Sequence, residues 1–269
     1  MAIPAQKTWV NQFVLFLCID FCTIVDIIIV NISTIVRRAF IRILIINGSP
    51  RTNGATGQTL SKIGETLAEM DATIEIEYIE LGKMDLLFCK GCTLCYQTGN
   101  CHITEDGIEN LSLKIAKAGG VVFGSPTYAS NVSGHLKILI DRGHFVFEQL
   151  LRNKACFSVI TYENFGGKKA QKVIKELIRF SGGAVSCKYW VKLNHGDKTL
   201  NHKRNKRIRK LCRKFLFKTG QTNPLSPYEK ILRTIAFHIG IKPHAFKNKS
   251  RYEGVIHRWI EQGLITERG

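Results

Sequence analysis

The sequence of 269 residues predicts an α/β fold built on a five-stranded parallel sheet. Three features predict it: an ordinary globular composition, short β-branched runs alternating with amphipathic helical patterns, and a glycine-rich turn after the first run. With 45% apolar and 22% charged residues the chain can bury a large core, which excludes disordered, collagen-like and coiled-coil classes. Strands that alternate with helices favour parallel pairing, right-handed crossovers and helices on both faces.

The first strand is predicted at 41–47, IRILIIN, a run typical of a strand buried on both faces. A helix follows from near Thr56, where apolar residues recur three to four positions apart. Further strands are predicted at 73–81, 120–126, 156–162 and 184–191, and helices at 106–118, 131–145 and 167–181. Ligands of such sheets bind at the carboxyl ends of the strands, so the loops 47–56, 125–131 and 161–167 should share one rim.

Strand, glycine-rich loop and helix together predict a phosphate-binding turn after Asn47. Loop N–H groups and the positive end of the helix dipole converge there, with hydroxyls from Ser49, Thr56 and Thr59 and a charge from Arg51. The turn has neither a Walker motif nor a complete G-x-G-x-x-G motif, which argues against ATP and NAD as its ligands. Taken alone, the pattern is equally typical of a plain strand-to-helix turn.

The other two loops offer an aromatic ring and glycines. Pro126 fixes the turn of the second loop, and Tyr128 presents a flat face that suits a planar ligand, unless it merely caps the core. The third loop, TYENFGG at 161–167, ends in two glycines that permit close backbone approach.

These segments carry a family resemblance. NGSPRTNGAT (47–56), a cysteine-rich loop and GSPTYASNVSGHLKILIDR (124–142) are similar to the NADPH-dependent FMN reductases, including the iron–sulfur flavoproteins, over residues 41–192. The resemblance implies a flavodoxin-like, doubly wound sheet of order 2-1-3-4-5, bound FMN and a homo-oligomer. By position it implies phosphate contacts at Ser49, Arg51, Asn53 and Thr56, and ring contacts at Pro126, Thr127, Tyr128, Asn131, Thr161, Gly166 and Gly167. Ala55 and Gly57 depart from the family pattern, and Gly57 is expected to loosen the first helical turn and so weaken phosphate binding.

Four cysteines follow the second strand with the spacing C-x2-C-x2-C-x5-C, at Cys89, Cys92, Cys95 and Cys101. Such a loop suits a [4Fe–4S] cluster, and tetrahedral zinc or metal-free thiols remain open. The resemblance favours the cluster, which we expect near the flavin edge because the loop leaves the sheet at the rim. The other five cysteines are expected to be buried, inert thiols. An odd total of nine favours a reducing compartment and hence the cytoplasm.

Residues 1–40 form a predicted N-terminal extension with an apolar run at 13–36. The run is long enough to span a bilayer, but Asp20 and Asp26 bring its insertion free energy to roughly zero. Three interpretations remain open: a membrane anchor, a helix packed on its own domain or a partner, and a start site placed too far upstream.

Residues 193–269 form a predicted helical extension with most of the chain's positive charge. Residues 188–269 hold 20 basic and 5 acidic residues, or +15 of the total +18. A basic amphipathic helix is predicted at 203–218, followed by helices at 224–240 and 251–265, with Tyr252 and Trp259 as packing residues. The basic helix could lie on an anionic membrane surface or pack on its own core or a sister subunit. Nucleic acid is disfavoured, because aromatic residues are not interleaved with the charges.

The sequence therefore predicts an FMN-dependent oxidoreductase that takes hydride from NAD(P)H. A quinone, a flavin or another small molecule would accept the electrons, or a [4Fe–4S] cluster would pass them to a protein. No catalytic side chain is predicted, since the flavin carries the chemistry. The alternatives are an electron carrier without enzyme activity and a membrane-associated scaffold in which FMN is structural.

Overall fold

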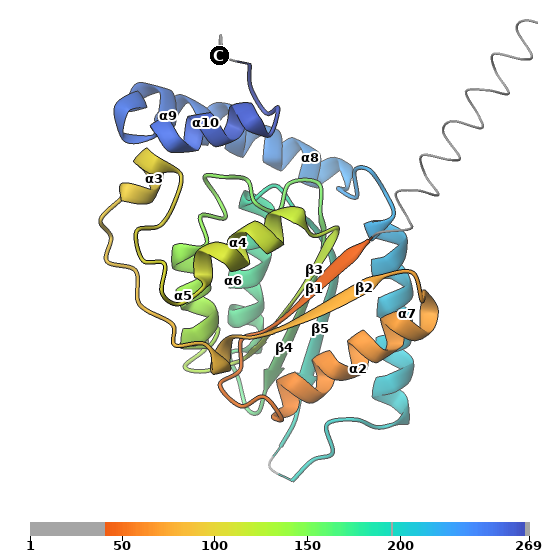
Figure 1. The fold of residues 1–269 in the computed structure, drawn as a ribbon. Helices are drawn as coiled ribbons and strands as arrows, with labels where there is room; N and C mark the ends of the chain where they lie inside the picture. The colour runs from red at the N-terminus through yellow and green to blue at the C-terminus, as the bar shows by residue number, and fades with distance from the viewer. Residues whose placement is uncertain (1–40, 195, 267–269) are drawn as a thin grey trace, which may run out of the picture. The chain divides into compact units, whose positions relative to one another are not determined.

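A computed structural model describes residues 41–194 and 196–266 of the chain. Five parallel strands form one sheet in the order β2-β1-β3-β4-β5 (Figure 1). The strands are β1 (Arg42–Asn47), β2 (Glu75–Glu80), β3 (Gly120–Pro126), β4 (Ala155–Tyr162) and β5 (Ala184–Lys192). The predicted α/β class and strand order are confirmed, and each strand lies within two residues of its predicted range.

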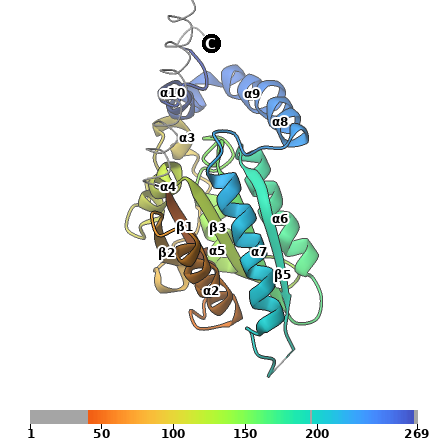
Figure 2. The ribbon, with the colours of Figure 1, turned by 90° about the vertical axis from the view of Figure 1, so that its right-hand side faces the viewer.

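Helices cover both faces of the sheet (Figures 1 and 2). One face carries α4 (Ile108–Lys117), α5 (Gly134–Arg142) and α6 (Gly167–Phe180), and the other carries α2 (Ala55–Met70) and α7 (His202–Thr219). Successive strand residues point to opposite faces, so Leu44 and Ile46 of β1 join the first core while Ile43 and Ile45 join the second. Burial on both faces is the reason that these strands lack a polar alternation.

The basic helix α7 is part of the sheet's own core. Its apolar residues Ile208, Cys212 and Phe215 are fully buried, and the Phe215 ring lies 5.9 Å from that of Phe157 on β4. Most of the lysines and arginines of α7 are exposed. Of the interpretations left open for 203–218, the structure shows packing on the chain's own sheet.

The chain beyond α7 forms a second, smaller core. It contains α8 (Pro227–Thr234), a π-helical turn η2 (Ile235–Ile241), α9 (Lys242–Lys247), the 3₁₀ turn η3 (Lys249–Arg251) and α10 (Glu253–Glu261). Trp259, Tyr252 and Phe237 are its largest buried side chains. The helix predicted at 224–240 is thus α8 followed by η2, and the helix predicted at 251–265 is α10.

No helix within residues 41–194 and 196–266 is long and apolar enough to cross a membrane. The predicted extension at residues 1–40, with its apolar run at 13–36, lies outside the described residues.

Two phenylalanines of α7 test whether this helix is core. Phe215→Ala should lower the free energy of unfolding by about 3 to 5 kcal/mol, because it removes a fully buried ring. Phe217 is 66% exposed, so Phe217→Ala should change it by less than about 0.5 kcal/mol. Urea unfolding followed by circular dichroism measures both, and equal small effects would show that α7 is not packed on the sheet.

Candidate functional site

Three loops lie together at the carboxyl edge of the sheet, the first two joined by hydrogen bonds and the third in close contact with the second. These rim loops are residues 48–54, 127–133 and 163–166, which follow β1, β3 and β4. Gly48 N donates to Gly124 O at 2.8 Å, and the Ser133 hydroxyl donates to Gly48 O, so the first two loops meet. Thr127 N donates to Thr161 O at 2.8 Å and joins the second loop to β4 just before the third. The structure thus brings together the three segments that the sequence placed on one rim.

The first rim loop leads into a helix N-terminus that is open to a ligand. Gly54 is the N-cap of α2 and offers no side chain to the N–H groups of the first turn. Ser49 and Thr56 beside it are buried, whereas Arg51 and Asn53 are exposed. The Ser49 hydroxyl accepts from Arg51 N at 3.1 Å, which leaves its own proton free to donate. Uncapped N–H groups, a free hydroxyl and the positive end of the dipole suit a phosphate.

A close backbone approach shapes this loop. A Cβ on Gly57 would lie 1.7 Å from Thr52 O, so only glycine fits. The sequence shows Gly57 as a departure from the family pattern, and the structure adds a reason for it: the missing Cβ lets the loop fold tightly onto α2. Thr56 Oγ1 lies 2.7 Å from Thr161 Oγ1, which adds a direct link between α2 and β4.

The second rim loop presents a tight two-residue turn with an exposed aromatic ring. Tyr128 and Asn131 exchange backbone hydrogen bonds of 3.0 and 2.9 Å across Ala129 and Ser130, which both have positive φ. Tyr128 is 43% exposed, so it does not merely cap the core. The turn therefore holds the ring at the edge of the sheet with little freedom.

Thr127 and Gly166 complete this side of the rim. The buried Thr127 Oγ1 has no hydrogen-bond partner among the described residues, although buried hydroxyls normally have one. Gly166 has a φ of 86°, and a Cβ there would lie 2.6 Å from Ser130 Cα, so the third loop touches the second. An unpaired donor beside an exposed ring and tightly packed loops fits a planar, polar cofactor such as FMN.

Comparison with known proteins supports this assignment. Residues 41–198 match the model of the NADPH-dependent FMN reductases. The chain is 37% identical over 223 residues to an iron–sulfur flavoprotein of Clostridioides difficile, covering 83% of this chain and 99% of that one. It is also 37% identical over 101 residues to an iron–sulfur flavoprotein of Methanocaldococcus jannaschii, covering 38% and 51% of the two chains.

The chain belongs to the NADPH-dependent FMN reductase family. It is therefore a flavin-dependent oxidoreductase of an FMN-binding family. Solved structures agree in fold: an apo NADH:FMN oxidoreductase has a TM-score of 0.51 at 14% identity, covering 70% of this chain and 91% of that one. An oxidoreductase of Corynebacterium diphtheriae has a TM-score of 0.50 at 15% identity, covering 66% and 95%. The flavodoxin-like fold is confirmed.

The cysteine loop, residues 84–107, joins the short 3₁₀ turn η1 (Leu81–Lys83) to α4. It begins beside the first rim loop, where a Cβ on Gly82 would lie 2.8 Å from Ser49 O. It then reaches Arg142, the last residue of α5, about 13 Å along that helix from the rim. The loop's one helix, α3 (Leu94–Thr98), lies at the end of the molecule that carries α10 (Figure 1). Part of the cysteine loop thus lies away from the rim, and a metal site near the flavin edge stays a prediction.

Arg142 holds the cysteine loop together. Its guanidinium pairs with Asp106 in a fully buried ion pair and donates to Leu87 O at 2.9 Å and Ile103 O at 2.8 Å. A fourth contact is with Cys101, whose Sγ lies 3.6 Å from Nη2. Burial alone would raise the pKa of Asp106, but Arg142 and backbone N–H donors hold it below its ordinary value. The pair is therefore charged at neutral pH.

A second buried cation lies beside Cys95. His144 Nδ1 is 3.0 Å from Glu148 Oε1, and both side chains are almost fully buried. Burial alone would lower the pKa of His144, but Cys95 and Glu148 raise it to about 10, so the imidazole is charged at neutral pH. Two of the four cysteines of the loop thus contact buried cations.

The four thiols share one short segment, but they do not converge. Cys89 and Cys92 are exposed, Cys95 and Cys101 are partly buried, and all four are free. Within residues 41–194 and 196–266, no three histidine, cysteine or carboxylate side chains are grouped to hold a metal ion. The donor set fits an iron–sulfur or zinc centre, and the adjacent cations suit a negatively charged one.

The C-terminal helix α10 packs on the cysteine loop. A Cβ on Gly254 would lie 2.1 Å from Gly99 N, and Arg258 donates to Gly99 O at 2.9 Å. The Tyr96 ring of α3 stacks on Tyr252 at 5.1 Å. These contacts, like those of Arg142 and His144, were missed from the sequence, since they join segments far apart in the chain without a local motif. Arg142 does end the segment 124–142 that carried the family resemblance, and this was the one signal in the sequence that could have pointed to it.

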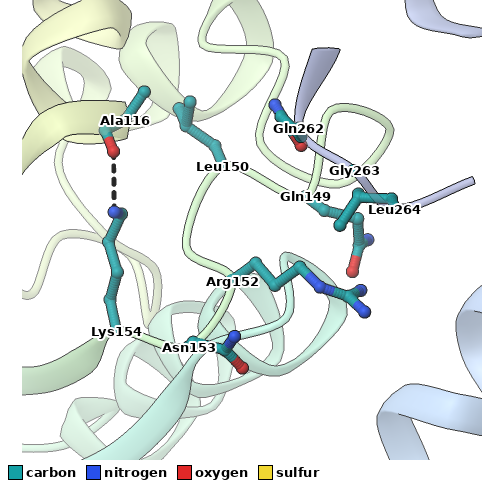
Figure 3. Close-up of a pocket in the computed structure, with 9 residues that line it drawn as sticks. All are labelled: Ala116, Gln149, Leu150, Arg152, Asn153, Lys154, Gln262, Gly263 and Leu264. Carbon is teal, nitrogen blue, oxygen red and sulfur yellow. Dashed lines mark hydrogen bonds between the residues drawn. The ribbon is translucent and has the colours of Figure 1, made fainter. Parts of the chain in front are cut away.

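A cavity of about 510 Å³ at this same end of the molecule is distinct from the rim (Figure 3). Lys154 lines it and donates to Ala116 O at 2.7 Å and Ala118 O at 2.9 Å. Both carbonyls lie at the C-terminus of α4, so the lysine caps that helix. Arg152 also lines the cavity, and its guanidinium lies over the Phe237 ring, 5.6 Å from the centroid. Packing accounts for both cations.

The Asp106–Arg142 pair gives a pH-dependent prediction. Asp106→Asn should lower the free energy of unfolding by about 3 to 5 kcal/mol at pH 7, because it leaves a buried guanidinium unpaired. Because the pKa of Asp106 is lower in the folded state than in the unfolded chain, the ionised carboxylate stabilises the fold above about pH 3.9. This stabilisation is lost as the pH falls further, so the unfolding free energies of the parent and Asp106→Asn should converge in acid.

Asp141 provides the matched control, because it pairs with Lys137 at the surface. Asp141→Asn should change the unfolding free energy by less than about 1 kcal/mol. Urea titrations between neutral and acidic pH make the comparison. A constant difference between parent and Asp106→Asn would contradict the assigned charge state.

Proposed function

We propose that the chain is an NAD(P)H-dependent FMN oxidoreductase whose rim loops hold the flavin. The observation that carries the proposal is that the three rim loops lie together beside the uncapped N-terminus of α2. Family membership supports FMN as the cofactor. A small molecule such as a quinone or a free flavin is the proposed electron acceptor.

The phosphate would lie at the first rim loop. The first-turn N–H groups of α2 and the Ser49 hydroxyl would donate to it, and the exposed Arg51 would supply a charge. Thr56 can contribute only one proton jointly with Thr161, because their hydroxyls bond to each other. The side chain of Asn53 is exposed at the same loop and completes the proposed set.

The isoalloxazine would lie against the second and third rim loops. Tyr128 offers its ring face, the unpaired Thr127 hydroxyl offers a hydrogen bond, and Gly166 and Gly167 leave room for the third loop to approach. Pro126 ends β3 just before the second rim loop, and Asn131 closes the loop's turn opposite Tyr128. When bound, FMN supplies hydride acceptance and release, and this chain's residues orient the ring and limit its contact with water.

We also propose that Cys89, Cys92, Cys95 and Cys101 hold a [4Fe–4S] cluster. The donor set, the buried cations at Cys95 and Cys101, and the similarity to iron–sulfur flavoproteins support it. Convergence of the thiols would accompany metal binding, as ligand ordering commonly does. Such a cluster would carry single electrons.

Removing hydroxyls from the first rim loop tests the flavin site. The double variant Ser49→Ala, Thr56→Ala loses hydrogen bonds to a charged group, each worth about 1.5 to 3 kcal/mol, so FMN should bind at least about tenfold more weakly. Ser61→Ala is the control, because Ser61 lies exposed on the same helix and should leave binding unchanged. Flavin fluorescence titration of the apoprotein measures all three, and unchanged affinity in the double variant would put the phosphate elsewhere.

Steady-state oxidation of NAD(P)H tests the activity. The purified holoprotein should oxidise NADH or NADPH with a quinone or free FMN as acceptor, and the double variant should lose activity in parallel with bound flavin. A yellow protein that takes no hydride from either nucleotide would instead indicate an electron carrier or a structural flavin.

Iron analysis tests the cluster. Cys95→Ser should lower the iron and acid-labile sulfide content of anaerobically purified protein. It should also slow electron transfer to one-electron acceptors, while the reduction of FMN by NAD(P)H persists. Cys156→Ala is the control: this thiol is fully buried, and burial holds its pKa far above the ordinary value. It should leave the iron content unchanged. If the parent protein contains no iron and no acid-labile sulfide, the proposal of a cluster is overturned.

A further inference from the structure

We propose that the exposed face of the α8–η2 helix binds an anionic membrane surface. Four large apolar side chains, here called the apolar stripe, follow one face of Pro227–Ile241. They are Tyr228, Ile231, Ile235 and Ile239, with 57%, 62%, 52% and 73% of their surface exposed. Contiguous exposed apolar surface of this kind on a folded domain commonly marks an interaction site.

The opposite face of the same helix is anchored, which fixes the stripe outward. The Glu229 carboxylate accepts hydrogen bonds of 3.0 Å from Val185 N of β5 and Ser226 N. Phe237 is almost fully buried, and its ring lies 5.1 Å from that of Trp259. The helix therefore cannot turn the stripe inward without breaking its own packing.

The spacing of the stripe matches the change in helix type. Four-residue steps overshoot one α-helical turn of 3.6 residues, so a long stripe at that spacing drifts around an α-helix. The turn becomes wider at Ile235–Ile241, where the helix is of the π type, and this reverses the drift. Ile231, Ile235 and Ile239 stay on one side as a result.

Nearly all the charged residues in the segment that carries the apolar stripe are cations. Residues 226–251 contain six lysines and arginines and a single acidic residue, Glu229. The cations are Lys230, Arg233, Lys242, Lys247, Lys249 and Arg251, of which Arg233 is held toward Asn153, to whose Oδ1 it donates at 2.6 Å. The Glu229 carboxylate is already bonded on the buried side of the helix, so this segment offers no carboxylate to a partner.

This charge pattern selects the occupant. A second copy meeting the stripe through a two-fold axis would place cations opposite cations, with no acidic group in the segment to pair them. An acidic protein would match the charge, but three of the stripe's four side chains are isoleucines, whereas protein interfaces are anchored mainly by aromatic and arginine side chains. A membrane with anionic lipids accepts aliphatic side chains below its headgroups and cations at their level.

A membrane-binding surface was one of the interpretations that the sequence left open for the basic helix at 203–218. In the structure, the apolar residues of that helix are buried in the sheet core, so they are not available to lipid. The stripe on α8–η2 takes this role instead. It lies at the end of the molecule opposite the rim loops (Figure 1), so the proposal does not depend on the flavin.

Vesicle binding by the full chain tests the proposal. Sedimentation with phosphatidylcholine vesicles that contain phosphatidylglycerol should capture the parent, and pure phosphatidylcholine or high salt should weaken capture. The triple variant Ile231→Ser, Ile235→Ser, Ile239→Ser should partition about a hundredfold more weakly into the anionic vesicles. The controls Leu113→Ser and Phe180→Ser alter exposed apolar residues of α4 and α6 and should bind like the parent. Unchanged flavin content shows that each variant folds.

Hydrogen exchange locates the contact independently of the apolar run at 13–36. Anionic vesicles should slow exchange at residues 227–241 in the parent and not in the triple variant. Equal vesicle binding by parent and triple variant would overturn the proposal, and so would equal binding to neutral vesicles. A parent that is a dimer by light scattering, becomes monomeric in the triple variant and ignores vesicles would assign the stripe to a second copy.

Discussion

The contact between Gly48 and Gly124 is the constraint on which the flavin edge depends. Gly48 N bonds to Gly124 O, and a Cβ at Gly48 would lie 2.8 Å from Cβ of Leu136 on α5. On Gly124 a Cβ would lie 2.5 Å from Leu60 of α2. Helices from both faces of the sheet therefore close on strand ends that have no room for a side chain. This closure draws the first two rim loops together beside the uncapped N-terminus of α2, where we propose that the phosphate binds.

Helix α5 connects this edge to the cysteine loop. Its N-cap, Ser133, bonds to Gly48 O at the rim, and its last residue, Arg142, forms the buried pair with Asp106. The C-terminal helices then close over the loop through Gly254 and Arg258. The extension beyond the sheet therefore has a structural purpose: it fixes a segment of thiols that the five-stranded domain alone would leave uncovered.

The features that could be predicted from the sequence are those set by the local pattern of apolar and polar residues. The strand runs, the helix beginning near Thr56 and the rim position of the three loops follow from periodicity and parallel topology, and the structure agrees. The place of the cysteine loop does not follow from periodicity, because Arg142 and Tyr252 position it across long separations in sequence. The helix at 203–218 could be predicted to be amphipathic, yet only the three-dimensional structure shows that its apolar side faces β4.

The central claim is that the first rim loop binds a phosphate, and a comparison of FMN with riboflavin tests it most directly. Riboflavin has the same ring system but no phosphate, so it loses every charge-assisted hydrogen bond to the loop, each worth about 1.5 to 3 kcal/mol. Fluorescence titration of the apoprotein should give a dissociation constant for riboflavin at least about a hundredfold above that for FMN. Equal dissociation constants would contradict the account.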